Sequence, residues 1–197
     1  MANVDRPNGA TAIDSLTGAP VVAKMNAYNV DSSNATAIFP GDFMQLEADG
    51  NVAVATAGAT NLIIGVCGGV EVAAPTQEDG FLSNNNIGVT EHPGYLPVST
   101  AGSVLIIDDP DQLFLVQAAG TITADDQGQN APIVAGAGST TTGRSAHEIN
   151  ATTTSTINQV RLIRPYKAAD NDVTLADSKW IVQITEHFYR QTSGVGV

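Results

Sequence analysis

The residues that most resemble a chemical motif form a glycine- and threonine-rich segment at 138–145, with the sequence GSTTTGRS. Its spacing matches a phosphate-binding loop, but Arg144 stands where the lysine that reaches the phosphates is required. Such a loop also lies between a strand and the N-terminus of a helix. Here Ile133-Val134 is short for a core strand, and the β-branched run at 151–156 disfavours a helix. We therefore expect a surface loop at this position.

Acidic residues and histidines are the other candidates for metal or acid–base chemistry. Asp108, Asp109 and Asp111 could bind calcium, but the segment lacks the glycine and the final glutamate of a calcium-binding loop. His147-Glu148 has no second histidine at the spacing of a zinc protease motif. We predict that the chain is not an enzyme and holds neither a metal nor a cofactor. A phosphate-loop-like or carboxylate-based enzyme is the weaker alternative.

The cysteine count and the net charge exclude several kinds of site and of binding partner. Cys67 is the one cysteine, so an internal disulfide and a multi-cysteine zinc site are excluded, and its apolar surroundings predict a buried side chain. Eight basic residues stand against twenty acidic ones, a net charge of −12, which opposes binding to nucleic acid or an anionic membrane. The start of the chain lacks the apolar region of a signal peptide, so we expect synthesis in the cytoplasm.

The elements that must position these residues are predicted to be strands. Short apolar runs end at glycine, proline or aspartate, and no long window has helical periodicity. Asp49-Gly50 predicts a type I′ hairpin turn, Gly68-Gly69 a bulge, and Thr123 the N-cap of one short helical turn. The strand-like runs are 35–39, 42–48, 51–55, 62–66, 70–73, 103–107, 113–117, 159–164 and 180–186. We predict an all-β fold, a small β-barrel or sandwich, with 103–107 and 113–117 as a second hairpin.

Two segments of the chain lack this pattern of strand-like runs. Residues 1–30 are rich in Asn, Gly, Ala and Pro, and we predict an extended N-terminal arm outside a β domain at 31–197. Residues 75–97 are predicted to form a long loop. The arm carries apolar side chains that a partner could cover, and we predict a partner-binding role for Val21, Val22, Met25 and Tyr28.

Several segments together resemble a family of tailed-bacteriophage virion structural proteins, the head decoration (cement) proteins. In chain order they are 1–9, 16–20, 35–42, 64–69, 98–101, 108–111, 138–145 and 184–187. The resemblance implies a β-tulip-like fold, with a jelly roll as the alternative. It also implies a homo-oligomer, commonly a trimer, on the outer surface of the capsid. There the chain would bind the major capsid protein and clamp neighbouring subunits. A tail or receptor-binding protein that binds glycan through its loops is the alternative in another class.

Overall fold

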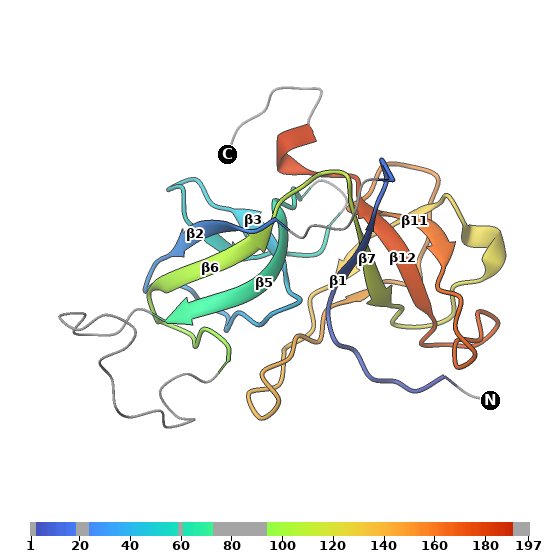
Figure 1. Cartoon of the computed structure of the whole chain (residues 1–197), viewed down its shortest axis with the longest axis horizontal. Coiled ribbons are helices and arrows are strands. Elements are labelled where there is room, and N and C mark those ends of the chain that lie inside the picture. Colours follow the sequence, from blue (N-terminus) through green and yellow to red (C-terminus); the bar gives the residue numbers. More distant parts are fainter. Residues whose placement is uncertain (1–2, 19–23, 59–60, 73–93, 191–197) are drawn as a thin grey trace.

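The computed structural model describes residues 3–18, 24–58, 61–72 and 94–190, and it confirms the all-β prediction (Figure 1). In these four ranges, the strands form two five-stranded antiparallel sheets and a separate two-stranded pair. None of these sheets closes into a barrel within the described ranges. In the same part of the chain, no helix has the length and apolar character needed to cross a membrane.

One five-stranded sheet, here called sheet A, has the order β1-β7-β12-β11-β8. Its strands are β1 (Thr11–Ser15), β7 (Gln112–Gln117), β8 (Asn130–Ala131), β11 (Val160–Pro165) and β12 (Lys179–Ile184). The two-stranded pair is formed by β9 (Ile133–Val134) and β10 (Glu148–Ile149). Strands β11 and β12 confirm the two late strands predicted from sequence.

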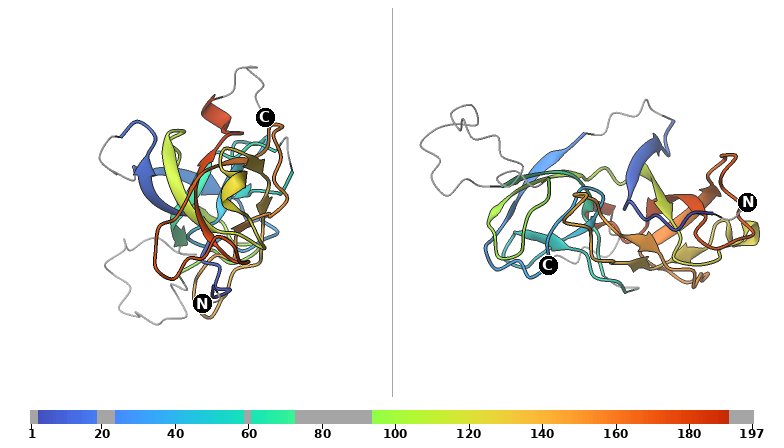
Figure 2. Two further views of the ribbon diagram at one scale, coloured as in Figure 1. Left: turned by 90° about the vertical axis from the view of Figure 1, so that its right-hand side faces the viewer. Right: turned by 90° about the horizontal axis from the view of Figure 1, so that it is seen from below.

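The other sheet, sheet B, has the order β2-β6-β5-β3-β4. Its strands are β2 (Asn26–Val30), β3 (Phe43–Leu46), β4 (Val52–Val54), β5 (Gly65–Val72) and β6 (Gly102–Ile107). The predicted bulge is confirmed, because the register of β5 against β6 shifts between Cys67 and Gly69. Figure 2 shows the two sheets from two further directions.

Two short 3-10 helices complete the described elements: η1 (Ala124–Asp126) and η2 (Phe188–Arg190). Thr123 precedes η1 as predicted, and its backbone N–H and hydroxyl both donate to the Asp126 carboxylate, each at 2.9 Å. The Asp126 carboxylate thus satisfies the Thr123 N–H, which would otherwise have no acceptor at the start of η1.

The first predicted hairpin is confirmed, but its turn differs from the prediction. Strands β3 and β4 pair in antiparallel register, and the Gly50 N–H donates to the Glu47 oxygen at 3.0 Å. Gly50 has φ +88°, whereas Asp49 is not among the residues with positive φ. The connection is therefore a three-residue loop with glycine at the left-handed position, instead of a two-residue type I′ turn.

The second predicted hairpin is wrong, because β6 and β7 belong to different sheets. Residues 108–111 carry the chain from sheet B to sheet A. The first two strands, β1 and β2, also lie in different sheets. Each strand pairs with an N-terminal strand instead: β6 with β2, and β7 with β1. Two apolar runs on both sides of a polar turn do not distinguish this crossing from a hairpin.

The prediction of an N-terminal arm outside the β domain is therefore wrong for residues 11–15 and 26–30. These residues are edge strands, one in each sheet, and their mixed polar composition is typical of strands with an exposed face. Residues 35–39 do not form a strand either, since only Ile38 makes a bridge, to Leu96. Most of the predicted loop at 75–97 lies outside the described residues.

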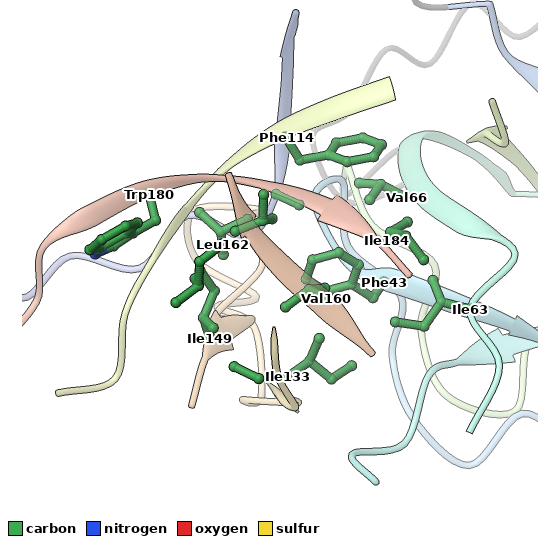
Figure 3. Close-up of a cluster of buried hydrophobic side chains, with 14 of the residues drawn as sticks. Phe43, Ile63, Val66, Phe114, Ile133, Ile149, Val160, Leu162, Trp180 and Ile184 are labelled. Carbon is green, nitrogen blue, oxygen red and sulfur yellow. The ribbon is translucent and has the colours of Figure 1, made fainter. Parts of the chain in front are cut away.

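Two apolar clusters hold the sheets. The larger one packs the inner faces of sheet A against the β9-β10 pair and the near end of sheet B (Figure 3). Phe43 and Val66 of sheet B meet Phe114 and Ile184 of sheet A within it, so this cluster joins the two sheets. The smaller cluster covers the other face of sheet B and includes Met44, Cys67, Leu96, Val104 and Ile106.

Candidate functional site

The predicted partner-binding residues occupy the edge of sheet B, as far as the structure describes them. Val21 and Val22 lie outside the described residues. Tyr28 packs against the smaller core cluster, and its hydroxyl donates to Asp108 at 2.6 Å and lies 2.9 Å from the Tyr189 hydroxyl. Burial and these partners raise the pKa of Tyr28. Tyr28 therefore fixes β2 to the 108–111 crossing, a contact within the chain.

Met25 lies differently, on an exposed apolar surface of sheet B. Its side chain is 45% exposed and covers Gly68, where a Cβ atom would come within 2.5 Å of the Met25 sulfur. Ala27, Leu105 and Gly69 are in register across β2, β6 and β5, and Leu105 is 40% exposed. We call Met25, Ala27, Gly68, Gly69 and Leu105 the sheet B patch.

A polar row borders the sheet B patch. Asn29, Ser103 and Glu71 are the next cross-strand set with the same orientation, two residues from Ala27, Leu105 and Gly69. An apolar centre with a polar border is the usual anatomy of a protein interface. The bulge contributes directly, because its two glycines have no side chains and so leave room for Met25 over Gly68 and for Leu105 beside Gly69.

A second cluster is buried where the N-terminal segment, β3 and the 138–147 region meet. Asp42, Ser145 and His147 are each at most 2% exposed. The His147 Nδ1 accepts a hydrogen bond from the Phe43 N–H at 3.1 Å, and its Nε2 lies 3.5 Å from the Asp42 Oδ1. Because Nδ1 is an acceptor, the proton of the neutral ring is on Nε2 and faces Asp42.

This serine, histidine and aspartate set does not have the geometry of an activated nucleophile. The Ser145 hydroxyl oxygen accepts from the backbone N–H of His147 at 3.0 Å, and both ring nitrogens already face other groups. No ring nitrogen is placed to take the serine proton, which nucleophilic catalysis requires. The cluster joins chain segments instead, because Phe39 also donates its N–H to Asp42 at 2.8 Å.

Burial shifts the titration of this cluster. It raises the pKa of Asp42 to about 6, against hydrogen bonds from Ser145 and Phe39 that lower it. It lowers the pKa of His147 to about 4. Cys67 is also buried, and burial followed by the charge of Asp42 raises its pKa to about 12, so its thiol stays protonated and unreactive near neutral pH.

The phosphate-loop-like segment forms a tight hairpin. Ser139 and Arg144 form a bridge, with the Ser139 N–H donating to the Arg144 oxygen at 2.8 Å, and Gly143 takes φ +65°. The segment is followed by β10 and not by a helix. The Arg144 guanidinium donates to the Asn8 side chain at 2.7 Å, which joins the hairpin to the N-terminal segment. The expected surface loop is thus present.

The aspartates of the 108–111 crossing have separate partners. Asp108 accepts hydrogen bonds from Asn26 and Tyr28, Asp109 accepts one from the Asp111 N–H, and Asp111 is paired with Arg190. In the described ranges, no three side chains of the kinds that ligate metals gather at one point. The role of these aspartates is to fix the passage between the sheets.

Sequence reasoning missed Leu105, Asp42 and Ser145. The exposure of Leu105 follows from its place in an alternating strand, 103–107, in which Val104 and Ile106 point to the core. The sequence of this run, with four consecutive apolar residues from Val104, does not indicate which of them is exposed. The Asp42 and His147 pairing joins residues far apart in the sequence, and no local pattern indicates it.

Comparisons with known proteins do not assign the chain to a family. No family model matches it, and neither a curated protein nor a solved structure matches it.

Proposed function

We propose that this chain is a capsid decoration protein that binds the outer surface of a phage head as a homo-oligomer, such as a trimer, and stabilises the shell. Its partner would be the major capsid protein. The proposal is supported by the eight segments that resemble head decoration proteins in the same order along the chain. The all-β architecture is compatible with it.

The sheet B patch is the observation that carries the proposal. Met25 and Leu105 are large apolar side chains that remain about half exposed, and they lie over the glycine bulge, where Met25 covers Gly68. Covering them gains hydrophobic free energy, about 1 kcal/mol for each partly exposed side chain. A repeated contact of this size is effective on a shell that presents many copies of the same site.

The test is shell binding by a variant with a charged patch. We expect Met25→Asp/Leu105→Asp to bind purified capsids at least tenfold more weakly and to lose the rise in capsid melting temperature that the wild-type chain produces. Leu175→Asp is the matched control, because Leu175 is 38% exposed and lies in the 166–178 loop, outside the sheet B patch. It should bind as the wild type does.

Folding of the variants has to be separated from binding. The milder Met25→Ser/Leu105→Ser pair leaves β2 and β6 uncharged and should give a smaller loss of binding with unchanged unfolding of the isolated chain. Equal melting temperatures of decorated and bare capsids would refute the stabilising role. Undiminished binding by both double variants would refute the role of the sheet B patch.

A further inference from the structure

A groove of about 1080 Å³ runs along sheet A, and none of its lining residues belongs to the sheet B patch. One wall is the N-terminal segment 3–9, and the second is the 137–146 hairpin region. Residues 166–179 form a third wall, and β7 forms part of the floor. The size suits a ligand of several linked units, since sites for small molecules usually range from about 300 to 1,000 Å³.

The walls are held in place by hydrogen bonds within the chain. Asn3 donates to the Asp172 and Ala176 oxygens at 2.8 and 2.7 Å, which ties the N-terminal segment to the 166–179 wall. Gln117 on the floor donates to the Val4 oxygen at 3.0 Å and accepts from the Arg6 N–H at 3.2 Å. The groove is therefore formed before any ligand binds, which reduces the entropy lost on binding.

The charge of the groove is opposite in sign to that of the chain. Arg6, Arg144 and Lys179 line it together with Asp170 and Asp177, so three of the eight basic residues of a chain of net charge −12 meet here. Lys179 is 3.7 Å from Asp170, and Arg144 uses one donor on Asn8. Within the described ranges, no ion pair engages the Arg6 guanidinium. Arginine binds carboxylates through two parallel hydrogen bonds.

We propose that this groove binds an oligosaccharide that carries carboxylate groups. Arg6 and Arg144 would hold the sugar carboxylate, while Asp170 and Asp177 would accept hydrogen bonds from sugar hydroxyls. Tyr166, which is 37% exposed, offers a ring face with a polar end. A polyacidic peptide fits less well, because it has few hydroxyls to donate to the two aspartates.

This inference is independent of the capsid contact, because the groove and the sheet B patch share no residue. A chain attached to a shell through sheet B could still present sheet A to a carbohydrate. The groove would then give a decoration protein a second binding activity, toward sialylated or uronate-containing glycans at a cell surface.

The experiment uses the full chain on a glycan array that holds sialylated, uronate-containing and neutral oligosaccharides, followed by calorimetry with the best ligand. We expect carboxylated glycans to bind above the neutral background. The same oligosaccharide with its carboxyl groups reduced to alcohols should bind at least tenfold more weakly. Arg6→Gln should also weaken binding at least tenfold.

The control is Lys24→Gln, which removes one positive charge at a position outside the groove and should bind as the wild type does. Arg6 suits the test because its guanidinium makes no ion pair with any residue that the structure describes, so the variant should unfold like the wild type. Absence of any carboxylated ligand on the array would overturn the proposal. Equal affinity of Arg6→Gln and wild type, or of the native and the reduced glycan, would also overturn it.

Discussion

Replacing His147 with alanine removes the centre of the buried cluster that joins β3 to the 138–147 region. The ring is 1% exposed, accepts the Phe43 N–H at 3.1 Å, and stacks on the Phe43 ring with centroids 6.0 Å apart. In the variant, the Phe43 N–H has no acceptor and water cannot reach it easily. The ring also leaves a cavity beside the largest core cluster, to which Phe43 belongs.

These two losses determine how far the free energy of unfolding of His147→Ala should fall. An unpaired buried donor costs about 1–3 kcal/mol, and truncation of a buried side chain of this size costs about 2–5 kcal/mol. We expect the free energy of unfolding to fall by about 3–8 kcal/mol, a large part of the stability of a typical domain. With a urea dependence of about 2 kcal/mol per molar, the unfolding midpoint should fall by about 1.5–4 M.

The assay is urea unfolding at pH 7, followed by the fluorescence of Trp180, which is the one tryptophan and is fully buried. His147→Gln should recover part of the stability, because its amide oxygen can accept the Phe43 N–H. Thr142→Ala, at the exposed tip of the neighbouring hairpin, should change the stability by less than about 0.5 kcal/mol. A loss below about 1 kcal/mol for His147→Ala would refute the reasoning.

Three further outcomes are expected. Asp42 has a pKa of about 6 in the folded chain and 3.8 in the unfolded chain. Its contribution to the free energy of unfolding is therefore present at low pH and is lost as the pH rises from about 4 to 6. Asp42→Asn should remove this loss, so that over the same pH range the stability measured in unfolding titrations rises more steeply with pH, by about 1.4 kcal/mol per unit. Gly9→Ala should lower the free energy of unfolding by about 2–4 kcal/mol, because Gly9 has φ +66° and a Cβ there would lie 2.6 Å from the Ser145 hydroxyl. Gly18 also has a positive φ, +71°, but a Cβ there would meet no atom within 4 Å, so Gly18→Ala should lower it by about 1 kcal/mol in the same assay. Deleting residues 1–30 should abolish the cooperative thermal transition, because it removes β1 and β2; an unchanged transition would restore the interpretation of these residues as a dispensable arm.

Local signals in the sequence predicted the local elements. The Asp49-Gly50 turn, the Thr123 cap and the Gly68-Gly69 bulge each depend on residues within a few positions of one another, and each is present. The turn type was mistaken because the choice between two- and three-residue loops depends on the register of the flanking strands. Register is set by packing across the sheet, which the turn sequence does not contain.

Strand partners could not be predicted in the same way. The runs at 103–107 and 113–117 have the pattern of a hairpin, yet Asp108 is fixed by Asn26 and Tyr28 more than 75 positions earlier in the chain. Those contacts draw β6 toward β2 and leave β7 to pair with β1. The composition of residues 1–30 hides this role, since edge strands tolerate the polar residues that suggested an arm.

The N-terminal residues connect the features that carry the two proposals. Residues 3–9 form a wall of the groove, β1 extends sheet A, and Met25 and β2 complete the sheet B patch. Gly9 and Ala10 join these features to the buried cluster, because Ala10 donates its N–H to the Gly41 oxygen at 2.8 Å and Gly9 lies against Ser145. A change that loosens the Asp42 and His147 cluster should therefore weaken ligand binding in the groove as well as stability. A change in the sheet B patch, which touches none of these contacts, should leave the groove intact.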